Sequence, residues 1–561
     1  MKARGFCGLA LVLTLLVPLN VAQAFPRLVH EIGRVSGNPV RLASSLCPPL
    51  PPPTGRIVHV DTEAELWTAV NENVPNTTIL VADGTYNLGQ HGYYLWFDTP
   101  NVTLRSASGN RESVILDDNY QSTEIVTILA SNVTIADLTI KRAGTHPIHV
   151  TSSDSGDTLN TLIYNVHIID PGQQAIKINP HAAKVHFPDN GVVACSHIEL
   201  TDAGRAKVWE INGSCYTGGV DAHQARGWTI RDNVIQGFWC QNGLSEHGVH
   251  FWTGSRDTVV ERNVLVDNAR GVGFGLQQSG SGRTYDDNPC PSASGYVGHY
   301  GGIIRNNFIF ASRDALFASD CGFDCGICLW QACDAAALHN TVVSTQAPFS
   351  SIEWRFSNTS ADIINNLVSH NLVERDGASA TLAGNLEHAP LTLFVDGAGG
   401  DLHLAASASP AIDQGLALAV GRCDDDIDGD ARPIGPARDI GADEYGTPSP
   451  AAVTDLRVTN AVTSTGTLTI TLRWTAPADA VTTTLRCSGT LVTQSAWDSA
   501  TLLTGVLSGS VETYTATVPY TDGTVYFALK SQNDKGEWSG LSNNAFWPHH
   551  DVYLPLLFRQ W

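Results

Sequence analysis

The 561-residue sequence is poor in basic side chains: 33 lysines and arginines stand against 55 aspartates and glutamates, a formal net charge of −22. Nucleic-acid binding needs basic patches that neutralise phosphates, so the composition argues against that partner. An acidic polymer would likewise need a local basic patch. After the first residues, no stretch reaches the roughly 18 consecutive apolar residues that span a bilayer. We therefore expect no transmembrane span.

The first 24 residues have the three parts of a secretory signal: Lys2 and Arg4, the apolar run 9–19, and Ala22-Gln23-Ala24 before the cleavage site. The mature protein is thus expected to be secreted or on the cell surface. We also expect it to be a monomer. Eleven of the twelve cysteines remain after cleavage, so at least one is unpaired. Four of them lie close together and could hold zinc if reduced, but an oxidising compartment favours disulfides. These four are Cys321, Cys325, Cys328 and Cys333.

Composition and periodicity divide the mature chain into a long body and a smaller module. Several stretches beyond residue 450 alternate apolar and polar residues at the period of a β-strand, with polar turns between them. The apolar end of the chain is too short to cross a bilayer. The expected segments are a signal peptide (1–24), a proline-rich lead-in (25–56), the body (57–446), a linker (447–450), a β-sandwich (451–547) and an apolar tail (548–561).

A short unit recurs through the body: an apolar pair, a polar residue or asparagine, then more apolar residues. Its irregular spacing predicts fixed strands joined by variable loops, as in a solenoid whose units bury their faces against each other. The unit contains Asn233, Asn263, Asn307, Asn340 and Asn366. With these features the body resembles right-handed parallel β-helix proteins of the pectate-lyase-like superfamily, including chondroitinase-B-like and alginate-lyase-like enzymes. The resemblance implies that the asparagines form a buried ladder.

The stretch 451–547 resembles a fibronectin type III sandwich with Trp474 in its core. The expected fold class is therefore all-β: a right-handed parallel β-helix followed by a small β-sandwich. Modules of this second kind generally bind or space.

Four segments of the body align by their apolar residues and predict two columns of side chains on one outer face. Stacked strands lie about 4.8 Å apart, and alternate residues point to opposite faces. Gly273 follows in the next coil and predicts a trough for a ligand above His250 and Trp252. The first column contains His149, Lys177, Asp221 and His250, and the second contains Thr151, Asn179, His223 and Trp252.

Such a face suits a polysaccharide, and we expect a secreted polysaccharide lyase that cleaves an acidic, uronate-containing polymer by β-elimination. This reaction needs a base, a cation that neutralises the uronate carboxylate, and an acid for the leaving oxygen. Lys177 or His250 could be the base if burial or a neighbouring cation lowers its pKa. Arg270, Arg256 or Arg355 could supply the cation. Asp221 would orient His223 or His250, or bind a transition metal with them. The resemblance adds the location of the site and no residue identities.

Substrate binding is expected from His149, Asn179, Glu246, Trp252, Glu353 and Arg355. Three alternatives stay open. Glu246 with Asp221 or Glu353 could form the carboxylate pair of a glycoside hydrolase. A uronate epimerase could use the same scaffold, and a β-helix can also be a non-catalytic carbohydrate-binding adhesin.

The acidic turn before Gly429 predicts a structural calcium ion. Asp424, Asp426 and Asp428 alternate there, a spacing that can wrap a hard cation with oxygen ligands. No glutamate stands at the later position that would complete such a loop, so a solvated acidic turn is the alternative.

Overall fold

The computed structural model describes residues 46–446, 450–494, 496–503, 507–533 and 538–547, with the backbone of strands β1 (Ile32–Val35) and β2 (Asn38–Val40). The predicted signal peptide and apolar tail lie outside the described residues. The same holds for most of the linker.

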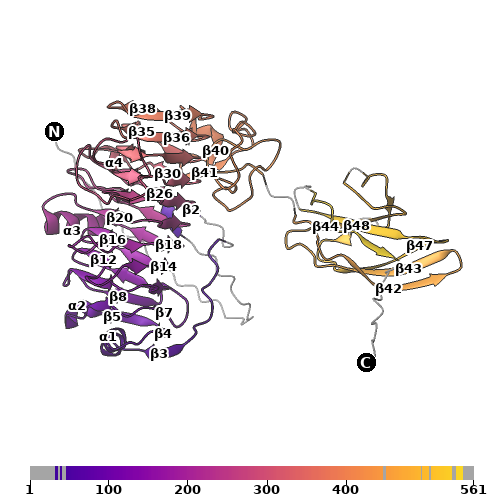
Figure 1. The fold of residues 1–561 in the computed structure, drawn as a ribbon, viewed down its shortest axis with the longest axis horizontal. Coiled ribbons are helices and arrows are strands. Elements are labelled where there is room, and N and C mark those ends of the chain that lie inside the picture. Colours follow the sequence, from indigo (N-terminus) through magenta and orange to yellow (C-terminus); the bar gives the residue numbers. More distant parts are fainter. Residues whose placement is uncertain are drawn as a thin grey trace, which may run out of the picture.

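Three long parallel sheets form the body, and most coils of the chain add one strand to each of them (Figure 1). The first sheet consists of β3 (Arg56–Val60), β4 (Thr77–Val81), β7 (Val102–Ser106), β10 (Thr134–Ala136), β14 (Leu162–Tyr164), β18 (Val192–Ala194), β21 (Thr229–Arg231), β25 (Val259–Glu261), β29 (Ile303–Arg305), β33 (Ala335–Leu338), β36 (Ser360–Ile364) and β39 (Ser379–Ala383). The second consists of β5 (Gly84–Asn87), β8 (Val114–Asp117), β11 (Thr139–Lys141), β15 (His167–Ile169), β19 (His197–Glu199), β22 (Val234–Gln236), β26 (Val264–Val266), β30 (Phe308–Ala311), β34 (Thr341–Ser344) and β37 (Leu367–Val368). The third consists of β6 (Leu95–Phe97), β9 (Glu124–Ile128), β12 (His146–Thr151), β16 (Gln174–Asn179), β20 (Gly218–His223), β23 (Val249–Trp252), β27 (Arg270–Phe274), β31 (Cys325–Trp330), β35 (Ser350–Arg355) and β38 (Leu372–Arg375).

The remaining elements of the body decorate these sheets. They are helices α1 (Glu63–Asn71), α2 (Leu88–His91), α3 (Asp202–Asn212) and α4 (Asp314–Phe317), the 3-10 helix η1 (Leu391–Leu393), the paired strands β13 (Thr158–Leu159) and β17 (Pro188–Asp189), the strands β24 (Ser255–Arg256), β28 (His299–Tyr300) and β32 (Ala332–Cys333), and the antiparallel pair β40 (Phe394–Asp396) and β41 (Asp401–Leu404).

The interior of the coils is apolar because alternate strand residues point inward. In the third sheet, Ile148, Val150, Ile176 and Ile178 are fully buried in one continuous core. The apolar-polar alternation by which the segments were aligned therefore predicts correctly which side chains are buried. Together with the parallel pairing, it confirms the predicted β-helix.

Helix α1 packs at the start of the solenoid, against β3, β4 and β6. Thr62 caps it: its side-chain oxygen accepts a hydrogen bond from the backbone N–H of Glu65. Leu66 and Val70 are buried under the helix. The helix thus covers apolar residues that the first coil would otherwise expose.

Disulfides join residues that are between 3 and 148 positions apart in the sequence. Among the described residues the bonds are Cys47–Cys195, Cys215–Cys240, Cys290–Cys333 and Cys325–Cys328, while Cys321, Cys423 and Cys487 are free. The preference for disulfides over zinc within the cysteine cluster is thus confirmed for three of its four members.

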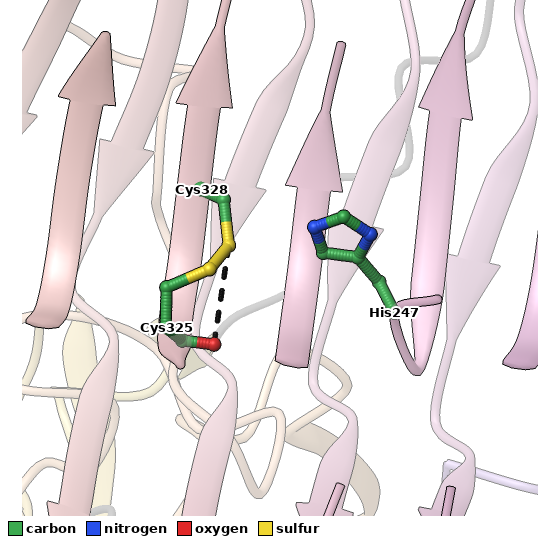
Figure 2. A group of neighbouring side chains, drawn as sticks. All are labelled: His247, Cys325 and Cys328. Atoms are coloured by element: carbon green, nitrogen blue, oxygen red, sulfur yellow. Dashed lines mark hydrogen bonds between the residues drawn. A yellow bond between two sulfur atoms is a disulfide. The ribbon is translucent and has the colours of Figure 1, made fainter. Parts of the chain in front are cut away.

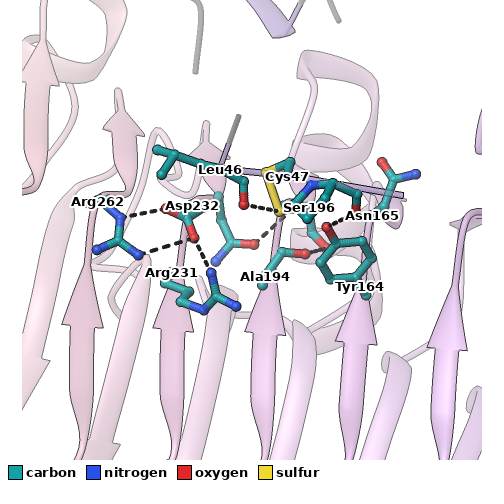
Figure 3. The surroundings of a disulfide bond; sticks show 12 residues. Leu46, Cys47, Tyr164, Asn165, Ala194, Ser196, Arg231, Asp232 and Arg262 are labelled. Carbon is teal, nitrogen blue, oxygen red and sulfur yellow. Dashed lines mark hydrogen bonds and ion pairs between the residues drawn. A yellow bond between two sulfur atoms is a disulfide. The ribbon is translucent and has the colours of Figure 1, made fainter. Parts of the chain in front are cut away.

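Figure 3 shows the first of these bonds, which holds the end of the lead-in against the first sheet. Tyr164 adds a hydrogen bond to the carbonyl of Pro48. Beside the bond, Asp232 lies between Arg231 and Arg262, at 2.7 and 2.8 Å. The described part of the lead-in is therefore attached to the β-helix and does not act there as a free spacer.

The C-terminal module contains antiparallel sheets around a core of its own. One sheet has β42 (Arg457–Ser464), β43 (Thr467–Arg473) and β47 (Thr513–Pro519), and the other has β44 (Thr482–Ser488), β45 (Thr501–Leu502), β46 (Leu507–Ser508), β48 (Val525–Gln532) and β49 (Ala545–Trp547). Trp474 is 1% exposed in the core between them. The predicted small β-sandwich is confirmed; its assignment to the fibronectin type III class stays a prediction. In the part of the chain described, no helix is long and apolar enough to cross a membrane.

Candidate functional site

Strand pairing in the third sheet confirms the two predicted columns. His149 lies opposite Lys177, Lys177 opposite Asp221, and Asp221 opposite His250. We call these four residues the ionic column. In the neighbouring column Thr151 lies opposite Asn179, and His223 lies opposite Trp252.

The prediction that the ionic column faces solvent was wrong for three of its members. Lys177 is 8% exposed, Asp221 2% and His250 0%. Their side chains point away from the apolar interior but are covered by other side chains. His223 and Trp252 are partly exposed, as are His149 and Asn179, while Thr151 is buried. The accessible part of the site is therefore Asn179, His223 and Trp252 of the second column together with His149.

Asp221 is the centre of the cluster. One of its carboxylate oxygens binds the ammonium of Lys177, and the other accepts a hydrogen bond of 3.1 Å from Trp252 Nε1. His250 Nδ1 lies 3.3 Å from that second oxygen. Burial alone would raise the pKa of Asp221, but the positive charge of Lys177 holds it well below the usual range. Asp221 is thus a permanent anion.

The two residues expected to act as bases carry positive charge. Burial disfavours the charged form of both, but the carboxylate of Asp221 outweighs it and raises the pKa of Lys177. Hydrogen bonds to Asp221 and Glu246 likewise raise the pKa of His250 to about 9. The expectation that burial would lower both pKa values was wrong, because the sequence did not reveal how close the carboxylates lie. Neither residue is a base near neutral pH.

His223 differs from these two residues. Its Nε2 lies 2.9 Å from Lys177 Nζ and 3.1 Å from Trp252 Nε1. The same nitrogen lies 3.2 Å from Asp221 Oδ2, so it faces two donors and one acceptor. The side chain is 23% exposed. His223 consequently presents a partly exposed ring nitrogen at the edge of a charged cluster.

His149 occupies the other end of the column. Its Nδ1 lies 2.9 Å from Glu124 Oε1, and its Nε2 lies 2.8 Å from Asn179 Oδ1. Asn179 is thereby connected to the ionic column, and Glu124 is a carboxylate that the sequence alignment did not include.

The expected trough at Gly273 is filled. A Cβ atom at this position would lie 2.5 Å from His247 Nε2, so the missing side chain makes room for the His247 ring. His247 is fully buried, and Glu246 beside it places Oε2 3.3 Å from His250 Nδ1. The glycine was correctly recognised as a place of close approach, but the approaching group belongs to the protein itself.

Figure 2 shows His247 next to the Cys325–Cys328 disulfide. The three side chains could present ligand atoms within 4.8 Å of one another. A thiolate is required for zinc binding, and the disulfide removes both thiolates. With the disulfide formed, these three side chains pack beside the ionic column and provide no thiolate for a metal.

The arginines and Glu353, expected to contact substrate, are engaged within the protein. Arg270 pairs with Asp324 at 2.8 Å, and Arg355 pairs with Asp376. Arg256 binds Asp287 through both oxygens. Glu353 is fully buried against Trp330, Ser350 and Arg375, and its pKa is raised by that burial. Neither Arg270 nor Arg355 thus offers an unpaired cation to a uronate.

Two exposed aromatic residues near the columns were missed in the sequence. Trp96 lies opposite Thr127, which lies opposite His149, so it extends the ionic column by two coils. It is 41% exposed. Tyr216, 39% exposed before β20, lies close enough to Lys177 to contribute to its raised pKa. Trp96 stands between two buried apolar residues, Leu95 and Phe97, so its place on the outer face could have been read from the strand period. A loop residue such as Tyr216 has no comparable signal.

The acidic turn directs its three carboxylates to different partners. Asp424 lies 3.4 Å from Arg438. Asp426 accepts backbone hydrogen bonds from residues 428, 430 and 444, and burial raises its pKa to about 7. Asp428 lies 3.1 Å from His403 Nε2. Calcium binding by Asp424, Asp426 and Asp428 stays a prediction.

The solved structures that resemble this chain share little sequence identity with it. No protein-family model and no curated protein sequence matches the chain. An alginate lyase from Paenibacillus sp. is similar over 58% of this chain and 99% of its own, with 14% identity and a TM-score of 0.41. A mutant tailspike protein of an E. coli bacteriophage, in complex with a hexasaccharide, is similar over 86% of both chains, with 12% identity and a TM-score of 0.38. A surface protein and adhesin of Streptococcus pneumoniae is similar over 58% and 95%, with 10% identity and a TM-score of 0.29.

Proposed function

We propose that the protein is a secreted carbohydrate-active enzyme that cleaves a uronate-containing polysaccharide by β-elimination at the second column. The observation that carries this proposal is the partly exposed imidazole of His223, whose Nε2 lies 2.9 Å from Lys177 Nζ and 3.2 Å from Oδ2 of the buried anion Asp221. The four disulfides support an oxidising, extracellular location.

In this mechanism His223 removes the proton next to the uronate carboxylate. The new imidazolium is stabilised by Asp221, whose Oδ2 lies 3.2 Å from Nε2. Lys177 and Trp252 can release His223 without losing a partner, because both already contact Asp221. A proton transfer at His223 therefore leaves no buried group unpaired.

The other requirements of the reaction are met by neighbours of His223. Lys177 is the positive charge closest to this imidazole and stabilises the anion that forms as the proton leaves. Tyr216 is the exposed hydroxyl donor for the leaving oxygen. Trp252 and Trp96 offer aromatic surfaces for pyranose rings. An epimerase would share the first step and differ in how the anion is reprotonated.

Hydrolysis receives less support because it needs a protonated carboxylic acid that the substrate can reach. Asp221 is held ionised, and Glu246 lies against the cationic His250. Glu353 has a raised pKa but is fully buried. Neither Asp221 nor Glu353 is thus an accessible acid.

Non-catalytic carbohydrate binding is the second candidate. It is favoured by the pairing of Lys177, Arg270 and Arg355 with carboxylates, which leaves their charge neutralised within the protein. A binder needs only the partly exposed polar and aromatic groups of the second column.

Incubation of the mature protein with alginate, pectin, chondroitin and hyaluronan distinguishes these functions. We expect ultraviolet absorbance of an unsaturated product with at least one polymer, and at least a 100-fold loss in His223→Ala, in line with the usual contribution of a general base. The matched control is His186→Ala, a partly exposed histidine bound to Asp157. New reducing ends without the absorbance would indicate hydrolysis. Retained binding without either signal would indicate an adhesin.

A further inference from the structure

A second cluster of ionisable groups lies on the second sheet, on strands β15 and β19. His167 lies opposite His197, and their rings stack with centroids 4.5 Å apart and an interplanar angle of 14°. Glu199 is two residues beyond His197 on the same strand, so its side chain is on the same face. Two imidazoles and a carboxylate from adjacent coils thus meet at one point.

The distances within the cluster suit a small ion. Glu199 Oε1 lies 3.0 Å from His167 Nε2, and Oε2 lies 3.9 Å from His197 Nε2. With bonds of about 2.0–2.1 Å to zinc, tetrahedral ligand atoms lie about 3.3 Å apart. The two observed separations are on either side of this value, so small side-chain rotations would bring all three groups to an ion.

One nitrogen of the cluster is unused. His197 is 7% exposed, and its Nε2, which faces Glu199, has no hydrogen-bond partner among the described residues. A buried polar atom without a partner costs free energy and is uncommon. The imidazole lone pair that it offers is the donor that zinc and related metals prefer.

A supporting shell surrounds the three groups. Glu112 Oε2 lies 3.1 Å from His167 Nδ1, which leaves the opposite nitrogen of that ring for a metal. Gln236 Nε2 donates a 2.9 Å hydrogen bond to Glu199 Oε2 and orients the carboxylate. Metal-binding histidines generally donate their other N–H to a carboxylate or carbonyl, as His167 does here.

We propose that His167, His197 and Glu199 bind a divalent transition-metal ion of the zinc class, with Glu112 and Gln236 as supporting residues. The ion joins the coils of β15 and β19 and leaves a fourth coordination position for water or a ligand. Two histidines and one glutamate are a donor set that zinc sites with an open position use.

Two other groups of potential ligands lie in the body, and in the first of them both nitrogens of His247 also lack a hydrogen-bond partner among the described residues. In the group of Glu246, His247 and His250, His250 Nε2 binds the carbonyl of Gly275 and Nδ1 lies between two carboxylates. In the group around His403, that ring contacts Asp401 at 2.6 Å and Asp428 at 3.1 Å. Variants of these groups show whether Co²⁺ binding depends on the cluster of His197 or on one of them.

The test uses the full mature protein, stripped with a chelator and titrated with Co²⁺ as the probe. Bound Co²⁺ is measured by equilibrium dialysis with elemental analysis, and its visible spectrum is recorded. We expect His197→Gln to lose one equivalent of Co²⁺ and the associated band, while His403→Gln and His247→Gln keep them. Glu112→Gln should keep the ion with roughly 10–100-fold weaker affinity.

Two results would overturn the proposal. The first is that the parent binds no Co²⁺, and the second is that His197→Gln shows a folded circular dichroism spectrum and still binds Co²⁺ as the parent does. If His197→Gln does not fold, Glu199→Gln is the deciding variant, because it keeps the shape of the side chain and removes the ligand charge. Zn²⁺ should compete with Co²⁺ in the parent and abolish its band.

Discussion

The β-helix contains two stacks that run along the coils, and they are built on different principles. In the asparagine ladder, Nδ2 of each residue donates to Oδ1 of the next at 2.9–3.0 Å. In the ionic column, neighbouring residues are of different types and alternate in charge where they are most deeply buried. The ladder contains Asn233, Asn263, Asn307, Asn340, Asn366 and Asn385.

The difference follows from what the side chains can do. An amide both donates and accepts, so the same bond can be repeated over any number of coils. Ionised groups cannot repeat in this way, because like charges one strand apart repel each other. A uniform stack therefore serves the solenoid as a whole, while the alternation of Lys177, Asp221 and His250 is confined to one place and is typical of a specialised site.

Removing the central anion of the ionic column should have the largest effect on stability. Asp221→Ala leaves Lys177 and His250 as buried cations without their main partner, which should lower the free energy of unfolding by about 3–5 kcal/mol. Guanidinium denaturation measures this loss. In the double variant Lys177→Met/Asp221→Ala the loss should be smaller than the sum of the two single losses; strict additivity would contradict the pairing.

Breaking the ladder should cost somewhat less, because its groups are neutral. Asn307 Oδ1 accepts from both N and Nδ2 of Asn263, and Asn307 Nδ2 donates to Asn340 Oδ1 and to the carbonyl of Val260. Asn307→Ala leaves several of these buried groups unpaired, at a total of about 3 kcal/mol. Denaturant unfolding is again the measurement.

The matched control for the ladder is an exposed asparagine stack at a turn. Asn132 Nδ2 donates to Asn101 Oδ1 at 3.0 Å, but both residues are exposed and in the left-handed region. Asn132→Gly keeps that backbone conformation and should change stability by less than about 1 kcal/mol, since water replaces the lost bond. Equal losses in the two stacks would show that burial does not decide the effect.

The two stacks should also differ in their response to pH, because only the ionic column titrates. The pKa of His250 is raised to about 9 in the folded protein, from about 6.5 when unfolded. Its contribution is therefore complete below pH 6.5 and is lost as the pH rises through 9, which amounts to roughly 3 kcal/mol. Unfolding free energies of the parent and of His250→Gln across this window measure the difference. A parallel decline in both would refute the assignment.

The sequence was sufficient to predict the fold, the register of the columns and the asparagine ladder. All three depend on repetition: apolar residues at a period of two fix which face is buried, and a shift by one residue would reverse every side chain. The pairing of Asp221 with His250 follows from that register alone. Asn385 escaped notice because it lies at the end of the body, beyond the last aligned unit.

The chemistry of the site was less predictable because it depends on loops and on distances between charges. His247 comes from the loop before β23 and fills the space above Gly273, a contact that no strand period contains. The protonation of Lys177 and His250 depends on whether burial or a nearby carboxylate has the larger effect on the pKa. Which of the two effects is larger depends on the distance between the carboxylate and the cation. For the same reason the sequence could not single out His223 as the partly exposed histidine beside Lys177 and Asp221.

The smallest expected effect concerns the covering of the ionic column by the His247 ring. Among the described residues the asparagine ladder has no such covering ring. In Gly273→Ala the new Cβ would lie 2.5 Å from His247 Nε2, so the ring must move, at a cost of about 1–2 kcal/mol. Gly156→Ala is the matched control, because a Cβ there meets no atom within 4 Å. Thermal unfolding of both variants gives the comparison. The double variant Gly273→Ala/His247→Ala removes the clash. Introducing Gly273→Ala into His247→Ala should therefore cost less stability than introducing it into the parent. An equal cost in both backgrounds would mean that the backbone, and not the His247 ring, requires the glycine.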